Sequence, residues 1–227
     1  MEVLQLLAGR DFAVGGKKLL HDLAVRMSNF CYAIIDVHSR EAILIDPCWD
    51  IEGILRAVKR ECGVTSVRAS IFTHRHFDHT GGQIPPSLTG GARFIVEGLS
   101  DVLKQTGCLV GVGEGDIQAT AEQTGVDSIV SLQEGADVFS LGSSSSSSVR
   151  LEVLETPGHT PGSLCFLLCH KEKTVSPVLI SGDTLFIGSC GRIDLRESDA
   201  RAMLYSLERL SRLPPATMVL PGHNCAL

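Results

Sequence analysis

Short apolar runs separated by polar turns recur along the first third of the chain and predict strands that alternate with a helix. Residues 31–37 and 42–45 form two such runs, and the polar residues between them predict a hairpin. Asp50 can cap a helix in which apolar side chains recur at helical spacing as far as Cys62. The β-branched apolar stretch at 67–72 then predicts a buried strand.

The pattern weakens between residues 81 and 125, where Gly and Pro interrupt short helical pieces such as 117–123. We therefore expect an insertion in this part of the chain. Its glycine-spaced segment at 111–115 lacks the strand, the full spacing and the downstream acid of a dinucleotide-binding loop, so we interpret it as a plain turn.

Further apolar runs in the second half predict more strands, and a helix is expected at 199–213 with its leucines and Met203 facing inward. A serine tract at 143–148 has no apolar anchor and predicts a solvated hairpin loop. The inward positions of the helix are Met203, Leu204, Leu207 and Leu210, and the strand runs are 138–141, 151–154, 164–168, 178–180 and 218–220.

The composition of the chain indicates its number of domains, its partners and its compartment. A chain of 227 residues that is 44% hydrophobic can bury one large core, so we expect a single domain over residues 1–227. Its net charge of −6, without a basic cluster, argues against a nucleic-acid partner. No apolar stretch reaches the roughly 18 residues of a membrane helix, and no secretory signal is present, so we expect no membrane partner. Eight cysteines without a CxxC pair favour reduced thiols and the cytoplasm, with a mitochondrion or another organelle as the alternative.

The run at 73–79, THRHFDH, contains the highest density of potential metal ligands in the chain. It places three histidines and one aspartate directly after the predicted strand at 67–72. Zinc and neighbouring first-row metals take imidazole nitrogen and carboxylate oxygen, and a binuclear site needs more of both than a single metal does. The run therefore predicts a metal site at the edge of a sheet.

Three later strands each lead to a glycine that is followed by another candidate ligand. Glycine lets the backbone turn sharply and approach a metal closely, so the next side chain can project into the site. One such residue alone is more often a structural group, but together with the run they divide into two sets that share a carboxylate. The candidate ligands are His74, His76, Asp78, His79, His159, Asp183 and His223.

The motifs THRHFDH, TPGHT, SGDTLF and PGH, in this order, resemble those of the metallo-β-lactamase-fold hydrolases, from about Phe30 to His223. The resemblance implies an α/β fold of four layers, an αββα sandwich with its active site at one edge. It also implies the division of the ligands. His74, His76 and His159 would bind the first metal, Asp78, His79 and His223 the second, Asp183 would bridge both, and Asp78 would act in catalysis by orienting the hydroxide.

Within this superfamily, GDTLFIGSCGR and RLPPATMVLPGH resemble the glyoxalase II group, which hydrolyses thioesters of glutathione. This likeness implies a hydroxyacylglutathione hydrolase-like enzyme that uses a metal-bridging hydroxide between two divalent ions, zinc being expected and iron or manganese the alternatives. The segment CGRID at 190–194 also resembles the persulfide dioxygenases, which would hold a single iron through His74, His159 and Asp183 and act on glutathione persulfide. A metal-bearing scaffold without turnover is the third reading.

Three departures from the glyoxalase II pattern concern the substrate. Where that group has a Lys and a Tyr two residues later, this chain has Arg192 and Asp194, and Cys225 stands where a Tyr follows the last histidine. We also expect the C-terminal helical domain of glyoxalase II to be absent. Arg192 can still clamp a carboxylate, so it is the candidate substrate-binding residue. A small-molecule thioester or another glutathione-derived compound is the expected partner.

Overall fold

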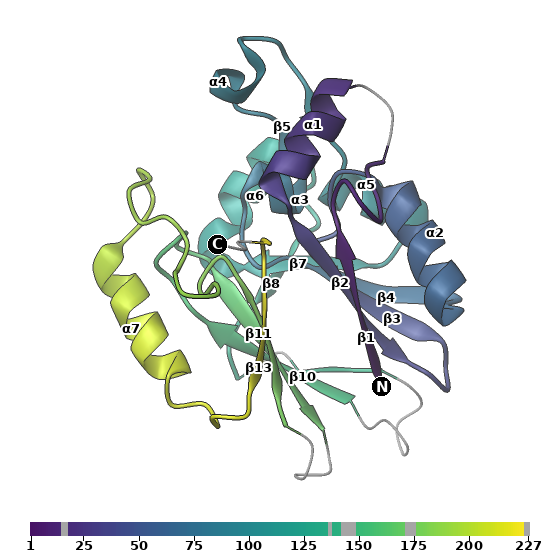
Figure 1. Cartoon of the computed structure of the whole chain (residues 1–227), viewed down its shortest axis with the longest axis vertical. Helices are drawn as coiled ribbons and strands as arrows, with labels where there is room; N and C mark the ends of the chain where they lie inside the picture. Colours follow the sequence, from purple (N-terminus) through teal and green to yellow (C-terminus); the bar gives the residue numbers. More distant parts are fainter. Residues whose placement is uncertain (15–17, 136–137, 142–148, 171–175, 225–227) are drawn as a thin grey trace.

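Two β-sheets face one another across the molecule (Figure 1). The computed structural model describes residues 1–14, 18–135, 138–141, 149–170 and 176–224. The first sheet has the strand order β1 (Glu2–Leu7), β2 (Phe30–Asp36), β3 (Glu41–Ile45), β4 (Ser66–Ile71), β7 (Leu109–Gly113) and β8 (Val130–Leu132). The second has the order β13 (Met218–Pro221), β12 (Val178–Gly182), β11 (Leu164–His170), β10 (Val149–Glu155) and β9 (Val138–Ser140).

Helices connect the parallel strands and cover the outer faces of the sheets. The strands β3, β4, β7 and β8 run parallel, so each connection must cross over, and α2 supplies the crossover from β3 to β4. The short strands β5 (Gly82–Gln83) and β6 (Ile95–Val96) pair separately. The helices are α1 (Lys18–Met27), α2 (Ile51–Cys62), α3 (Phe77–Thr80), α4 (Pro86–Thr89), α5 (Leu99–Thr106), the 3₁₀ turn η1 (Glu114–Asp116), α6 (Ile117–Thr124) and α7 (Ala200–Leu210).

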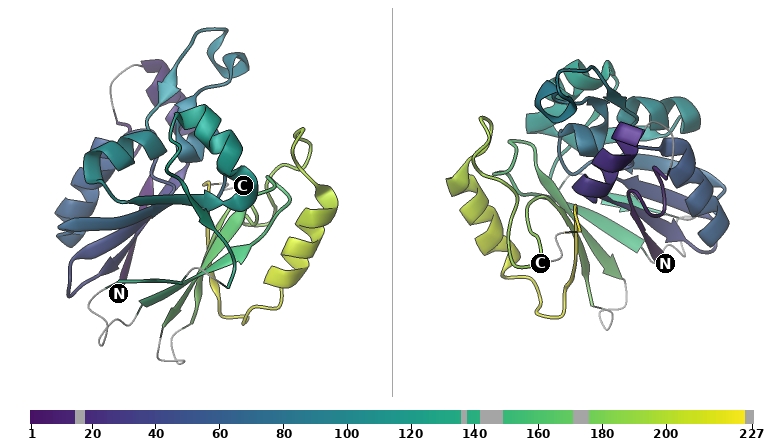
Figure 2. Two further views of the ribbon diagram at one scale, coloured as in Figure 1. Left: turned by 180° about the vertical axis from the view of Figure 1, so that it is seen from behind. Right: turned by 45° about the horizontal axis from the view of Figure 1, so that its top comes forward.

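The buried side chains form three apolar clusters that separate four layers. One cluster lies between the two sheets and includes Ile34 and Phe166. A second lies between the first sheet and its helices and includes Ile35 and Ile54, while the third lies under α7 around Leu210. Adjacent residues of β2 thus enter different clusters, which is why its sequence is apolar throughout instead of alternating. The predicted αββα sandwich is confirmed, as Figure 2 shows from two sides.

The strands and the helix predicted in the first third of the chain are confirmed, including the cap at Asp50, whose carboxylate accepts from the Gly53 N–H. Other predictions need correction. The segment 81–125 is not merely an insertion, because β7 is an internal strand between β4 and β8. Leu204 does not face inward but is 54% exposed, because the buried face of α7 turns through Met203 and Leu210 instead.

The N-terminal strand β1 and the helix α1 were not among the elements expected from the sequence. The serine tract at 143–148 and Cys225 lie outside the described residues. Within the described ranges, none of the helices has the length and apolar character needed to cross a bilayer.

Candidate metal centre

The sheet topology brings the four ligand-bearing segments to one edge of the sandwich. β10 and β12 are both antiparallel to β11, and β13 is parallel to β12, so these three strands end on the same side. The loops that follow them carry His159, Asp183 and His223, and the loop after β4 carries the run at 73–79. The structure therefore brings together all seven residues predicted from the sequence.

Three imidazoles form the first group of donors. The Nδ1 atom of His76 lies 3.1 Å from the Nε2 atom of His74 and 2.9 Å from the Nε2 atom of His159. His74 and His159 are buried. Imidazole lone pairs that converge in this way, away from water, repel one another unless a proton or a cation lies between them. The group is suited to hold a metal ion.

The second group combines two imidazoles with a carboxylate. The Nε2 atoms of His79 and His223 lie 3.2 Å apart, and Asp78 Oδ2 lies 3.7 and 3.5 Å from them. Two nitrogens and an oxygen are a donor set suited to zinc, iron or manganese.

Asp183 stands between the two groups, with one carboxylate oxygen toward each. Its Oδ2 atom lies 3.5 Å from His159 Nε2, whereas its Oδ1 atom lies 3.4 Å from His223 Nε2 and 3.6 Å from His79 Nε2. Among the described residues, the buried Oδ1 atom has only these two longer contacts and accepts no hydrogen bond of ordinary geometry. A buried carboxylate oxygen of this kind is costly unless a cation satisfies it, so the residues present fit a metal centre.

The outer nitrogen of each histidine is held by an acceptor, and this fixes which nitrogen faces the cluster. A proton on the outer nitrogen leaves the lone pair of the inner nitrogen free for a metal. The contacts are His79 Nδ1 with Asp46 Oδ2 at 2.8 Å, His159 Nδ1 with the Arg192 carbonyl at 2.8 Å, His223 Nδ1 with the Met27 carbonyl at 2.7 Å, His76 Nε2 with Glu197 Oε1 at 3.2 Å, and His74 Nδ1 with the Thr73 hydroxyl at 3.0 Å.

Glycine is needed at these turns, as Gly182 and Gly222 illustrate. Gly182, before Asp183, has a φ of +49°, in the left-handed region that side chains with a Cβ rarely adopt. At Gly222, before His223, a Cβ atom would lie 2.5 Å from Asp183 Oδ1. Both glycines thus allow the backbone to approach the cluster, as the sequence pattern predicted.

Asp46 supports the cluster from the end of β3, a role that sequence reasoning missed. Its carboxylate accepts hydrogen bonds from the Thr73 N–H and the Thr73 hydroxyl, both at 2.7 Å, as well as from His79 Nδ1. The signal available in the sequence was its position directly after a strand, at the same edge as the ligands.

Replacing Asp46 with alanine is expected to lower the free energy of unfolding by about 3 kcal/mol, because Thr73 and His79 lose a buried acceptor. Asp46 has a φ of 51°. Asp46→Asn is the matched control, because asparagine tolerates this conformation and keeps one acceptor oxygen, so its loss should be smaller. Urea unfolding of both variants measures the difference, and equal stability of wild type and Asp46→Ala would contradict the expectation.

The N-terminal segment supports the second group, which the sequence also did not reveal. The Asn29 amide donates to Asp78 Oδ2 at 3.0 Å and accepts from Trp49 Nε1 at 3.1 Å. Because Met27 also holds His223, the end of α1 and the turn that leads into β2 fix ligands that lie far away in sequence. Asp78 is therefore oriented by a neutral donor.

The surroundings of the cluster shift the pKa values of two of its histidines in opposite directions, lowering that of His74 and raising that of His223. Burial and the neighbouring imidazoles lower the pKa of His74 well below its ordinary value. Burial also lowers the pKa of His223, but the carboxylates of Asp183 and Asp78 outweigh that effect and raise it to about 10. At neutral pH the second group is therefore the one that carries a proton.

Zinc binding to chelator-treated protein is expected to release at least one proton at neutral pH, because His223 Nε2 must lose its proton to bind a cation. Zinc affinity should rise about tenfold per pH unit for each proton released. Because folding raises the pKa of His223 from 6.5 to about 10, its protonated form stabilises the folded, chelator-treated protein. This contribution is full below pH 6.5 and is lost as the pH rises through about 10. Calorimetry in buffers of different ionisation enthalpy measures the protons, and His223→Gln should release one fewer.

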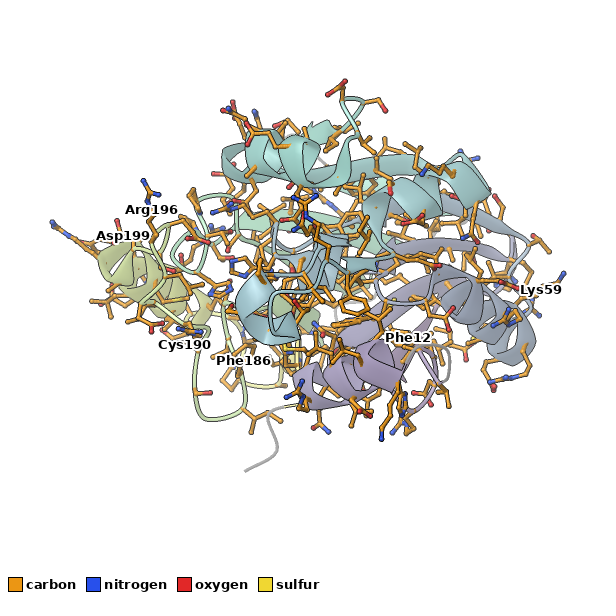
Figure 3. All side chains as sticks on the ribbon, turned by 90° about the horizontal axis from the view of Figure 1, so that it is seen from above. Phe12, Lys59, Phe186, Cys190, Arg196 and Asp199 are labelled. Carbon is orange, nitrogen blue, oxygen red and sulfur yellow. The ribbon has the colours of Figure 1, made fainter. Side chains whose placement is uncertain are left out.

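Arg192 contributes its backbone to the cluster, while its side chain lies at the exposed rim. The guanidinium forms two contacts of 2.9 Å with the Asp194 carboxylate, and both side chains are 68% exposed. In the same loop the Phe186 ring lies edge-on to His223, with centroids 5.9 Å apart. Figure 3 looks down on this edge and labels Phe186 and Cys190 in the loop. A contact between Arg192 and substrate remains a prediction.

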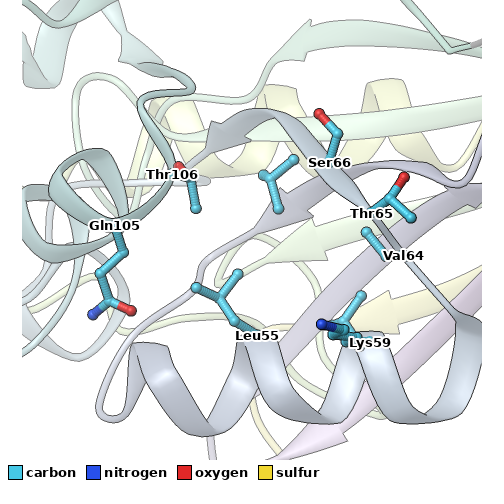
Figure 4. Close-up of a pocket in the computed structure, with 9 residues that line it drawn as sticks. Leu55, Lys59, Val64, Thr65, Ser66, Gln105 and Thr106 are labelled. Carbon is cyan, nitrogen blue, oxygen red and sulfur yellow. The ribbon is translucent and has the colours of Figure 1, made fainter.

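A separate groove of about 320 Å³ lies at the opposite end of β4 from the cluster (Figure 4). Leu55, Lys59 and Val67 are among the residues that line it. The groove is separated from the predicted ligands by the length of β4, so it is not part of the metal centre.

Known proteins are similar to this chain in sequence and in fold. The family model of the metallo-beta-lactamase superfamily matches residues 109–223. A hydroxyacylglutathione hydrolase from Polaromonas sp. is 32% identical over 197 residues, which cover 86% of this chain and 62% of that protein. The probable polyketide biosynthesis zinc-dependent hydrolase BaeB of Bacillus velezensis is 31% identical over 203 residues, which cover 87% of this chain and 73% of that protein.

A solved structure agrees with these relatives. The crystal structure of TTHA1623 in a di-iron-bound form superposes with a TM-score of 0.61 at 28% identity, covering 87% of this chain and 88% of that one. Together with the αββα layers and the His and Asp groups at their edge, the matches establish the family. The chain belongs to the metallo-β-lactamase superfamily of hydrolases.

Proposed function

We propose that the protein hydrolyses small thioesters at a centre of two divalent metals, with a hydroxyacylglutathione as the leading substrate and zinc as the metal. One observation carries the proposal: two groups of donors lie on either side of Asp183, each facing one of its carboxylate oxygens. The relatives named a hydroxyacylglutathione hydrolase and a zinc-dependent hydrolase support the same reading.

Each residue of the cluster has a role in this proposal. Divalent cations bound here would lower the pKa of a coordinated water toward about 7 and polarise a carbonyl oxygen. Asp78, held by Asn29, would orient the attacking water. The first cation would be held by His74, His76 and His159, the second by Asp78, His79 and His223, with Asp183 shared between them.

The ionised state of the nearby acidic side chains favours a thioester as the substrate. Burial raises the pKa of Asp183, but the surrounding imidazoles outweigh it and hold that pKa well below its ordinary value. Burial likewise raises the pKa of Glu197, while His76 and Arg75 lower it to a net decrease. Both groups are therefore carboxylates at neutral pH without a proton to donate. A thiolate leaves without protonation, whereas an amide nitrogen requires it.

Oxidation of a persulfide at a single iron is the second candidate. The observation that favours it is the segment CGRID at 190–194, which resembles the persulfide dioxygenases at the point where the chain departs from the glyoxalase II pattern. The same His and Asp side chains would serve either metal.

Elemental analysis combined with two assays tests the proposal. We expect two zinc per chain, thiol release from S-lactoylglutathione, and no oxygen uptake on glutathione persulfide. One iron per chain with oxygen uptake would establish the second candidate instead. Lactoyl N-acetylcysteamine, a thioester without carboxylates, serves as the control substrate, and Arg192→Ala should raise KM for the glutathione thioester alone if Arg192 binds its carboxylate.

A further inference from the structure

Glu197, in the loop before α7, reaches the first group of donors from outside it. Its Oε1 atom lies 3.2 Å from His76 Nε2, although the two residues are 121 positions apart in the chain. The Nδ1 atom of His76 is the one that faces His74 and His159. Glu197 therefore contacts the nitrogen that points away from the cluster. Figure 3 labels its neighbour Arg196 on the α7 side of the molecule.

The two groups of donors are supported in parallel ways. In the second group, the carboxylate of Asp46 holds the outer nitrogen of His79. In the first group, backbone carbonyl and hydroxyl oxygens lie against the outer nitrogens of His159 and His74. Glu197 is the carboxylate that does so for His76. Each group thus contains one histidine backed by an anionic side chain, and a carboxylate partner makes an imidazole a more basic ligand.

Glu197 is itself fixed by an ion-pair network. The Arg75 guanidinium lies 3.0 Å from Glu197 and 3.7 Å from the buried carboxylate of Asp116. Asp116 also accepts from the Arg75 N–H at 3.0 Å and from the Thr160 hydroxyl at 2.6 Å. Arg75 lies between His74 and His76, and Thr160 follows His159, so the network joins the two ligand loops of the first group to the loop of Glu197.

We propose that Glu197 is a positioning residue of the first donor group, acting through His76 by keeping Nδ1 toward the cluster and raising its basicity. The inference rests on the metal centre proposed above. Carboxylates that back a metal-bound histidine contribute about 10- to 100-fold to metal affinity. Their side chain touches neither the metal nor the substrate, so the effect should appear in metal binding before any chemistry.

Zinc titration of chelator-treated Glu197→Ala in competition with a chromophoric chelator tests this role. We expect one of the two zinc ions to bind about 10- to 100-fold more weakly than in the wild type, the other being much less affected. Glu197→Gln keeps an acceptor oxygen but not the charge, so it should fall between the wild type and Glu197→Ala. Glu208→Gln, an exposed carboxylate on α7, is the matched control and should bind both ions normally.

The outcomes separate the role of Glu197 from the metal centre itself. Affinities of Glu197→Ala within twofold of the wild type for both ions would overturn the positioning role. Failure of the wild type to bind zinc would overturn the metal centre and the proposed function instead. If Glu197→Ala does not fold, Glu197→Gln decides, since loss of the charge alone must weaken one ion. Nuclear magnetic resonance of ¹⁵N-histidine in the zinc-loaded protein should show His76 protonated at Nε2, and a proton at Nδ1 would contradict the geometry.

Discussion

Asp183→Asn is expected to reduce thioester hydrolysis by on the order of 10³-fold or more, because several kcal/mol of charge stabilisation at the reacting centre would be lost at about 1.36 kcal/mol per tenfold. Asparagine has the same shape but no charge. One of its amide hydrogens would face imidazole nitrogens that now surround the carboxylate at 3.4–3.6 Å. Neither donor group would then have its shared anion.

Metal content and activity are measured together for this variant. We expect Asp183→Asn to retain less than half of the metal bound by the wild type while the circular dichroism spectrum stays native. Asp127→Asn, which changes an exposed aspartate outside the cluster, controls for the loss of one negative charge. Full metal content with undiminished hydrolysis in Asp183→Asn would show that the two donor groups do not depend on a shared carboxylate.

Asp78→Ala is expected to abolish hydrolysis as well, but to remove only the metal of the second group. Asp78 supplies the carboxylate of that group and contacts none of the imidazoles of the first group at the distances found for His79 and His223. Its loss leaves two histidines without their anion. The first group keeps its three imidazoles, so one metal should remain.

The Asp78 variant also separates the two proposed chemistries. One zinc per chain with hydrolysis lowered by on the order of 10³-fold would fit a binuclear hydrolase. Oxygen uptake on glutathione persulfide at the wild-type rate in Asp78→Ala would instead fit a mononuclear iron enzyme. Asp78→Asn is the companion variant. Its amide oxygen can take the place of Oδ2, where it faces His223 and still accepts from the Asn29 amide. It should keep more of the second metal than Asp78→Ala.

The members of the cluster could be predicted from the sequence because each has a signal in the residues next to it. Asp183 and His223 follow a strand and a glycine, and the run at 73–79 follows another strand. These signals need only neighbouring residues, so they can be read without a tertiary structure. The motif order also led to the superfamily, which the family model and the relatives confirm.

The residues that hold the cluster histidines in place could not be predicted from local sequence. Glu197 meets His76 over 121 positions and Met27 meets His223 over 196, so nothing in the local sequence links them. The segment 81–125 was interpreted as an insertion because Gly111 and Gly113 looked like turn residues. They are strand residues at points where another chain segment packs too closely for a Cβ, against Leu132 and the Gly162 backbone.

The sequence by itself thus determined the alternation of strands and helices, the superfamily and the seven candidate ligands, because periodicity and short motifs are properties of neighbouring residues. The family resemblance also implied two groups with a shared carboxylate, but only the tertiary structure gave their geometry, with His159 nearest to Oδ2 of Asp183 and His79 and His223 nearest to Oδ1. It also decided that Asp46 and Glu197 back one histidine in each group, and that Arg192 gives its carbonyl to His159 while its side chain pairs with Asp194. The physical reason is that such contacts arise when separate strands end at one edge, and strand order and register, not local composition, fix which side chains meet there.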